Sequence, residues 1–239
     1  MTTTVDAVRQ FIASTDKSLL LDSSFLENTL IPSLGLNNEI LHEQPKELSD
    51  YFGGGLGLRI WQYPNQFSDY LLYLASVAPK ISSYLEIGCR FGGTFILTCE
   101  YLKAMGAQLT HAVAVDLIDA CPLMEEYTSS VDGAAFWKID SKSSLFTELT
   151  SNTFFDLVLI DGDHSYEGVR HDSLTMQKNS NIRVFHDIVS SACPGVVRYW
   201  QEIKSDNAYD IHEFTQQYES VANTFLGIGI AESKTWTHV

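Results

Sequence analysis

The stretch VLIDGDHSYEGVRHD, residues 158–172, decides how this chain is interpreted. The apolar run that leads into it, residues 154–160, ends abruptly at Asp161, Gly162, Asp163 and His164. Asp and Gly are common in the turn that follows a strand, so a plain turn is one interpretation. The other is a reactive site, because carboxylate and imidazole groups at a strand end can hold a metal ion and move a proton.

Strand and helix patterns alternate on both sides of this stretch. This alternation predicts an α/β fold in which helices cover both faces of a mostly parallel, seven-stranded sheet. Ligands of such sheets bind beyond the carboxyl ends of the strands, so the residues at those ends are the candidate site. The predicted strands are 83–87, 109–115, 134–139, 154–160, 182–185, 208–214 and 225–231. One predicted helix covers residues 67–77 and ends before Pro79, and the others span 93–105, 166–177 and 195–204.

The first 60 residues are predicted to form a helical N-terminal extension. Apolar side chains recur at helical spacing in residues 5–12 and again in residues 25–30, before Pro32. A glycine-rich connector, residues 53–57, follows. No Lys-Ser or Lys-Thr pair comes after these glycines, which excludes a P-loop and favours a hinge or the edge of a lid.

Composition excludes several classes of partner. The 239 residues carry a net charge of −15, which is unfavourable for binding nucleic acid or an anionic membrane. The N-terminus lacks the basic start and apolar stretch of a signal peptide, and no apolar run approaches the roughly 20 residues of a membrane span. The four cysteines form no CxxC pair, so we expect free thiols and a cytoplasmic protein.

The first predicted strand runs into a glycine loop. Glu86 lies in the strand, Gly88 permits a tight turn, and Gly92 and Gly93 precede a helix whose N–H groups can face a ligand. The order G-C-R-F-G-G is not a regular GxGxxG, so a simple strand-to-helix turn remains the alternative.

The next two strand ends carry acids. Asp116, 28 residues after Gly88, stands where Rossmann-type folds place the acid that binds a ribose diol. Asp140 and Ser141 follow the third strand, where they can reach an adenine amino group. The alternative is a helix cap supplied by Ser141 or Ser143.

The fourth and fifth strand ends suggest a cation site. Neighbouring strands lie only about 5 Å apart, so Asp161 and Asp187 can share one divalent ion if their strands are adjacent. Oxygen ligands with nitrogen support suit Mg²⁺ or Mn²⁺. The alternative is that Asp161 caps the next helix and that His186 is an ordinary buried histidine.

Three motifs together resemble those of class I S-adenosylmethionine-dependent methyltransferases. They are YLEIGCRFGGT, VLIDGDHSYEGVRHD and VFHDIVSSACPGVVRYWQEIK, and the resemblance extends over about residues 60–230. The chain is most similar to the macrocin O-methyltransferase and cephalosporin-hydroxylase-like group. This resemblance implies a Rossmann-like methyltransferase domain over residues 61–239, with residues 1–60 as extension and lid.

The resemblance also implies roles for individual residues. Asp161 and Asp187 would bind the metal, with His186 as a further candidate although relatives can carry an acid there. His164 would be the general base and Asp161 a second catalytic residue. The predicted cofactor-binding residues are Glu86, Gly88, Arg90, Gly92, Thr94, Asp116, Asp140 and Ser141.

The expected function is therefore an S-adenosylmethionine-dependent, Mg²⁺- or Mn²⁺-assisted O-methyltransferase. Its acceptor would be a hydroxyl group of a sugar, a polyketide or another natural product. Trp61, Gln62 and Tyr63 are predicted to contact this acceptor; the alternative is that the aromatic pair packs the extension onto the sheet. A metal-independent enzyme that methylates nitrogen or oxygen, and an NAD-dependent oxidoreductase, remain rivals, and the apolar extension would permit a homodimer.

Overall fold

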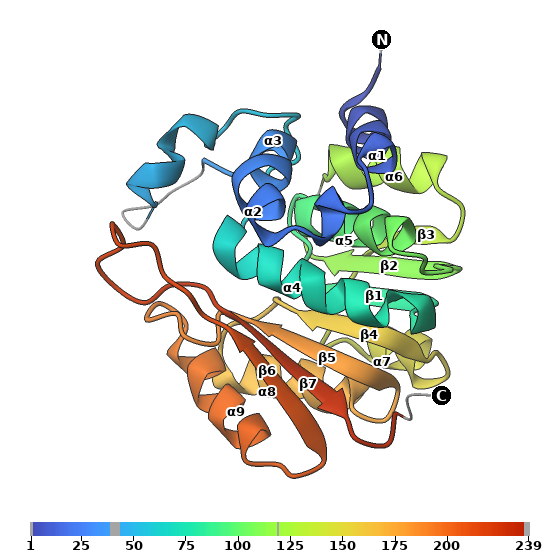
Figure 1. The fold of residues 1–239 in the computed structure, drawn as a ribbon. Coiled ribbons are helices and arrows are strands. Elements are labelled where there is room, and N and C mark those ends of the chain that lie inside the picture. The colour runs from blue at the N-terminus through green and yellow to red at the C-terminus, as the bar shows by residue number, and fades with distance from the viewer. Residues whose placement is uncertain (1, 39–43, 119, 237–239) are drawn as a thin grey trace.

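A computed structural model describes residues 2–38, 44–118 and 120–236. Its centre is a seven-stranded sheet in the order β3-β2-β1-β4-β5-β7-β6 (Figure 1). β7 runs antiparallel to both β5 and β6, and the other neighbouring pairs are parallel. The predicted fold class is confirmed. The strands are β1 (Ser83–Ile87), β2 (His111–Asp116), β3 (Ala134–Lys138), β4 (Phe155–Ile160), β5 (Ser180–His186), β6 (Tyr209–Phe214) and β7 (Ile228–Ser233).

Alternating side chains of the central strands build two separate cores. Tyr84 of β1 and Leu157 of β4 face one core, and Leu85 and Val158 face the other. Because both faces are buried, the central strands are almost continuously apolar, as expected for a parallel sheet.

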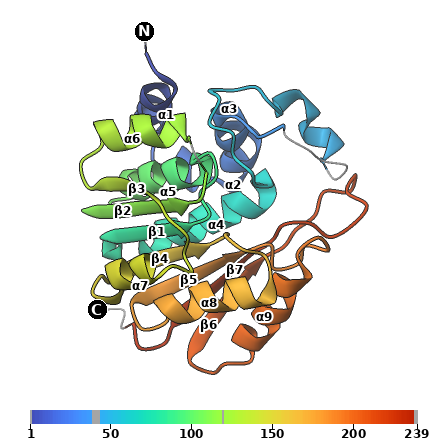
Figure 2. The ribbon, with the colours of Figure 1, turned by 180° about the vertical axis from the view of Figure 1, so that it is seen from behind.

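More helices cover one face of the sheet than the other (Figures 1 and 2). The first core is covered by the N-terminal helices together with α4, α5 and α6, and the second by α7, α8 and α9. The main helices are α1 (Thr4–Ser14), α4 (Pro64–Val77), α5 (Gly93–Ala104), α6 (Pro122–Ser130), α7 (Ser144–Ser151), α8 (Tyr166–Met176) and α9 (Pro194–Lys204), and the short ones are η1 (Leu19–Leu21), α2 (Ser23–Phe25), η2 (Leu26–Leu30), α3 (Ile31–Leu34), η3 (Lys46–Tyr51) and η4 (Ala78–Lys80).

The N-terminal helices share the core of the sheet. Val5, Val8 and Ile12 of α1 are buried in the first core, as their helical spacing predicts. The second helical segment does not end before Pro32. It continues to Leu34 through the wider π turn of η2, which avoids the clash that proline causes in a regular α-helix.

The glycine-rich connector is tightly packed. Gly53 and Leu56 donate backbone hydrogen bonds to the carbonyls of Leu36 and Ser33. A Cβ on Gly55 would lie 2.5 Å from the Ser33 carbonyl oxygen. The connector therefore anchors the extension and brings the following residues, 57–61, against the start of α5, where a Cβ on Gly93 would lie 2.3 Å from the Leu58 carbonyl oxygen.

Two of the main helices had no predicted span, α6 and α7, although a helix capped by Ser143 was one of the alternatives and α7 has that cap. Both are short, and each buries few side chains: Met124 and Tyr127 in α6, Phe146 and Thr150 in α7. Such short, half-polar segments carry too few apolar repeats to predict a helix. None of the helices in the described ranges combines the length and the apolar character needed to cross a membrane.

Candidate active site

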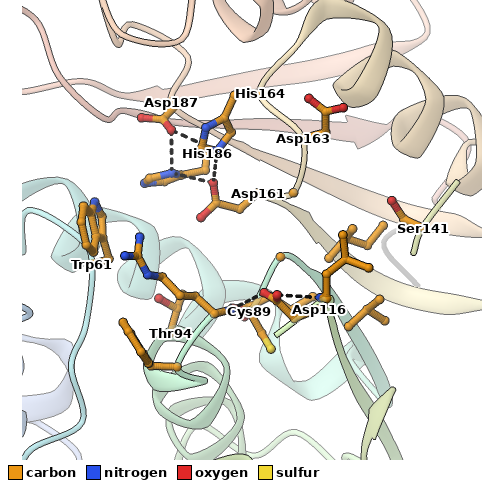
Figure 3. Close-up of a pocket in the computed structure, with 18 of the residues that line it drawn as sticks. Trp61, Cys89, Thr94, Asp116, Ser141, Asp161, Asp163, His164, His186 and Asp187 are labelled. Atoms are coloured by element: carbon orange, nitrogen blue, oxygen red, sulfur yellow. Dashed lines mark hydrogen bonds and ion pairs between the residues drawn. The ribbon is translucent and has the colours of Figure 1, made fainter. Parts of the chain in front are cut away.

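A cavity of about 650 Å³ opens at the carboxyl ends of β1, β2, β4 and β5 (Figure 3). It is lined by two regions that lie far apart in the sequence, the glycine loop after β1 and the acidic ends of β4 and β5. Because β4 and β5 are hydrogen-bonded neighbours, the predicted adjacency of these two ends is confirmed. The lining residues from the predicted site are Glu86, Gly88, Arg90, Thr94, Asp116, Asp140, Ser141, Asp161, His164, His186 and Asp187.

The glycine loop is held across the ends of its neighbouring strands. Gly88 has a φ of +88°, and its N–H donates to the Val115 carbonyl at 2.8 Å. A Cβ at this position would lie 2.1 Å from the Asp161 carbonyl oxygen, so only glycine fits. Gly92, with a φ of +80°, is the N-cap of α5 and lies behind the cavity wall.

Glu86 is a buried carboxyl group facing this loop. It is 2% exposed, and it accepts a hydrogen bond of 2.5 Å from the Tyr84 hydroxyl. Burial raises the pKa of Glu86 to about 8, although the Tyr84 hydrogen bond opposes the shift. A group of this kind can hold or release a proton near neutral pH beside a charged ligand.

Asp116 shapes the first half of the cavity. Its carboxylate accepts backbone hydrogen bonds from Arg90 at 2.6 Å, from Leu117 at 2.7 Å and from Ile118 at 3.1 Å. These bonds fix the glycine loop to the end of β2.

The loop after β3 forms the far wall of this half. Asp140 accepts from the Lys142 backbone N–H, and the Asp140 carbonyl accepts from Ser143. Ser143, not Ser141, caps α7 by accepting from the Phe146 N–H at 3.1 Å. Asp140 and Ser141 therefore both stay on the cavity wall.

Four side chains converge at the ends of β4 and β5 (Figure 3). Asp161 Oδ1 lies 3.0 Å from His186 Nδ1 and 3.2 Å from His164 Nε2. Asp187 Oδ2 lies 3.4 Å from His186 Nδ1 and 3.5 Å from His164 Nε2. Asp163, in contrast, points away from this group and pairs with Lys142.

The imidazoles and carboxylates shift one another's pKa. Burial raises the pKa of Asp161, but attraction to His186 and hydrogen bonds from both histidines outweigh it, so the pKa falls to about 2. Hydrogen bonds with Asp161 and Cys193 raise the pKa of His164 to about 10. Burial lowers the pKa of His186, yet attraction to Asp161 and Asp187 brings it well above its usual value.

This group has the features of a cation site. Asp187 is 4% exposed, and its Oδ1 atom has no hydrogen-bond partner among the described residues. Its φ of +62° is rare for a residue with a side chain and fixes the direction of the carboxylate. Asp161 does not cap α8, because Ser165 does. The donor set therefore fits a divalent ion better than a set of structural caps.

The wall opposite the acidic group comes from the extension and from the segment before β7. Trp61 lines the cavity, and the Arg90 guanidinium lies over its ring at 4.3 Å. Gln62 is buried outside the lining, and Tyr63 packs against Tyr218 and Phe225, as the packing alternative expects.

Sequence reasoning treated Cys193 only as a free thiol. Its Sγ lies on the cavity wall and donates to Asp187 Oδ2 at 3.3 Å. A Cβ on Gly195 would lie 2.4 Å from the Tyr166 N–H nitrogen, so this glycine lets the start of α9 approach the His164 loop. The available signal was the position of Cys193, six residues after Asp187 and directly before Pro194 and Gly195. All four cysteines are free and buried, as predicted for the thiols.

Comparisons with known proteins agree with this architecture. Residues 85–188 match the model of a family described as a methyltransferase domain. No curated protein matches the chain in sequence. Among solved structures, a provisionally assigned O-methyltransferase of Klebsiella pneumoniae aligns with a TM-score of 0.56 and 15% identity, over 95% of this chain and 96% of that one.

Two further structures are similar at the same level. An O-methyltransferase of Bacillus cereus in complex with S-adenosylhomocysteine has a TM-score of 0.52 and 14% identity, over 95% of this chain and 97% of that one. A provisionally assigned RNA methyltransferase of Pyrococcus horikoshii has a TM-score of 0.51 and 16% identity, over 91% and 97%. Residues 85–188 therefore match a methyltransferase-domain family, and the chain has the Rossmann-like fold of the class I methyltransferases.

Proposed function

We propose that this methyltransferase transfers the methyl group of S-adenosylmethionine to a hydroxyl oxygen of a small molecule, with a divalent cation held by Asp161 and Asp187. The observation that carries the proposal is the single cavity shared by the glycine loop and the acidic ends of β4 and β5. A methyl donor at the loop and an acceptor at the acidic end would then lie side by side.

The cofactor half is assigned from its contacts. The methionine part would lie along the cavity wall at Gly88 and Gly93, beside the buried carboxyl of Glu86. Asp116 and the Asp140–Ser141 pair line the portion where the ribose and adenine would lie.

The acceptor half supplies orientation and proton transfer. Asp161 and Asp187 would hold the cation, which would supply Lewis-acid activation of the acceptor hydroxyl. His164 is half-exposed at the cavity, 3.2 Å from Asp161, where it can take the proton that the acceptor oxygen loses when it bonds to the methyl group. Hydrogen bonds with Asp161 and Cys193, together with attraction to Asp161 and Asp187, raise the pKa of His164, so a cation held by these groups would favour the neutral imidazole that this role needs.

RNA is the alternative acceptor that a similar structure suggests. The net charge of −15 argues against it, because binding a phosphate backbone requires a basic surface. A hydroxylated small molecule, such as a sugar, a polyketide or another natural product with adjacent oxygens, suits a chelating cation better.

The test is methyl transfer to a panel of diols, sugars and polyphenols, followed by mass spectrometry with and without a chelator. We expect O-methylated products that disappear when the cation is removed. Products that survive chelation would remove the cation from the proposal, and N-methylated products would change the acceptor class. No binding of S-adenosylmethionine would defeat the proposal as a whole.

A further inference from the structure

The donor atoms around Asp187 differ from those of an all-oxygen site. Among the residues that the structure describes, two groups of three bring their donor atoms within 4.8 Å of one another, Asp161–His186–Asp187 and His164–Asp187–Cys193. Asp187 belongs to both. Nitrogen and sulfur atoms thus outnumber carboxylates around the shared residue.

The spacing of these donors suits a four-coordinate ion. The measured separations between neighbouring donor atoms run from 3.0 Å for Asp161 and His186 to 3.5 Å for His164 and Asp187. Bonds of about 2.0–2.1 Å in a tetrahedron place the ligand atoms about 3.3 Å apart. The Sγ of Cys193 lies 3.3 Å from Asp187 Oδ2, slightly closer than the roughly 3.6 Å that a longer metal–sulfur bond of about 2.3 Å would give.

Asp187 provides an independent indication of a ligand. It is almost fully buried, and its Oδ1 atom lacks a hydrogen-bond partner within the described part of the chain. Leaving a buried carboxylate oxygen unpaired is costly, and a bound cation removes that cost.

We propose that this site is built for a borderline transition ion of the Zn²⁺ or Co²⁺ type rather than for Mg²⁺, and that Cys193 is one of its ligands. Mg²⁺ requires near-octahedral oxygen coordination, whereas imidazole and thiolate groups select Zn²⁺ and similar ions. The inference rests on the cation site of the proposed function and replaces the Mg²⁺ or Mn²⁺ expected from sequence.

The inference also constrains His164. Its Nε2 atom is the one that faces both carboxylates. A nitrogen bound to a cation has no lone pair for a proton, so His164 is either a ligand or the proton acceptor.

The test is titration of the metal-stripped, full-length protein with Co²⁺, followed by absorption spectroscopy. We expect a near-ultraviolet thiolate-to-cobalt charge-transfer band and the strong visible bands of a four-coordinate ion. The charge-transfer band is lost in Cys193→Ser and kept in Cys89→Ser, because Cys89 lines the same cavity but belongs to neither donor group. In His164→Ala, a change in the visible bands marks His164 as a ligand, and unchanged bands show that its Nε2 atom is not bound to the ion.

Calorimetry with Zn²⁺, Mg²⁺ and S-adenosylhomocysteine separates the remaining outcomes. Tighter binding of Zn²⁺ than of Mg²⁺ supports the inference, and retained S-adenosylhomocysteine binding shows that Cys193→Ser is folded. Tighter Mg²⁺ binding, or no charge-transfer band in the unmutated protein, overturns the inference but leaves an oxygen-bound cation in place. Binding of S-adenosylhomocysteine without any metal binding would contradict both the divalent cation of the proposed function and the Zn²⁺-type ion inferred here. The proposal of a methyltransferase would remain.

Discussion

The two halves of the cavity satisfy their carboxylates in different ways. In the half beside β1 and β2, the Asp116 carboxylate accepts hydrogen bonds from three backbone N–H groups, so both of its oxygens have partners in the protein. In the half beside β4 and β5, Asp161 and Asp187 meet only imidazoles and a thiol, and Asp187 keeps a buried oxygen without a partner among the residues described. The carboxylate of Asp116 fixes a loop, whereas those of Asp161 and Asp187 face nitrogen and sulfur donor atoms.

The largest effect that tests this contrast is expected from Asp187→Asn. Asparagine tolerates the positive φ of this position, so the backbone is retained. The methyl-transfer rate should fall by about 10²–10³-fold, as when other preorganised electrostatic groups are removed. Affinity for S-adenosylhomocysteine, measured by calorimetry, should stay unchanged, because the Asp187 carboxylate interacts with His164, His186 and Cys193.

Asp116→Asn is the matched control in the other half. The NH₂ group of asparagine cannot accept a hydrogen bond, so one of the backbone N–H groups that now donate to Asp116 would lose its acceptor. Hydrogen bonds to a charged group are worth about 1.5–3 kcal/mol, so S-adenosylhomocysteine should bind about 10- to 100-fold more weakly. Metal binding should persist. If both variants lose the same property, the two halves are not separate functions.

The sequence predicted the bounds of β1 and the adjacency of the strand ends that carry Asp161 and Asp187. The bounds of β1 are those expected, because a short buried strand leads directly into Gly88, a position that only glycine can occupy. The convergence of Asp161 and Asp187 follows from the parallel strand order. Both results depend on local pattern and on general rules of α/β sheets.

What the sequence missed depends on contacts between distant segments. Cys193 reaches Asp187 because Gly195 lets α9 approach the His164 loop, and no periodic pattern encodes that approach. Tyr63 turns away from the cavity because Tyr218 and Phe225, more than 150 residues later, pack around it. Side-chain direction at such positions is fixed only by the complete fold.

Gly88→Ala should damage both halves at once, since Gly88 lies where they meet. A Cβ would collide with the Asp161 carbonyl oxygen at 2.1 Å, in addition to the cost of a positive φ. We expect the free energy of unfolding to fall by about 2–4 kcal/mol in denaturant titrations.

Gly106→Ala is a control that separates the cost of a positive φ from the cost of a steric clash. Gly106 has a φ of +102°, but a Cβ there would meet nothing within 4 Å. Only the conformational cost of about 1–2 kcal/mol remains. Equal losses in the two variants would show that the approach of Gly88 to Asp161 does not matter for stability.

The smallest effect concerns Asp172, which lies in α8 behind the loop of Asp161. A Cβ on Gly162 would lie 3.4 Å from its Oδ2, and neither carboxylate oxygen has a hydrogen-bond partner in the described ranges. Burial raises the pKa of Asp172 from 3.8 to about 6.

The direction of the pH dependence follows from this raised pKa. Below pH 3.8 the carboxyl is neutral in both states, and its contribution to stability is fully present. As pH rises to about 6, the unfolded chain ionises first, so stability is lost, and above that pH the loss is constant.

Asp172→Asn removes this titration while keeping the shape of the side chain. Relative to the unmutated protein, its free energy of unfolding should therefore increase with pH, by on the order of 2 kcal/mol, until about pH 6. Urea unfolding at a series of pH values measures the difference, with Asp50→Asn on the exposed surface as a control for net charge. A difference that does not change with pH would mean that Asp172 has a hydrogen-bond partner in the folded protein. The buried carboxyl behind the Asp161 loop would then be satisfied in the way that Asp116 is.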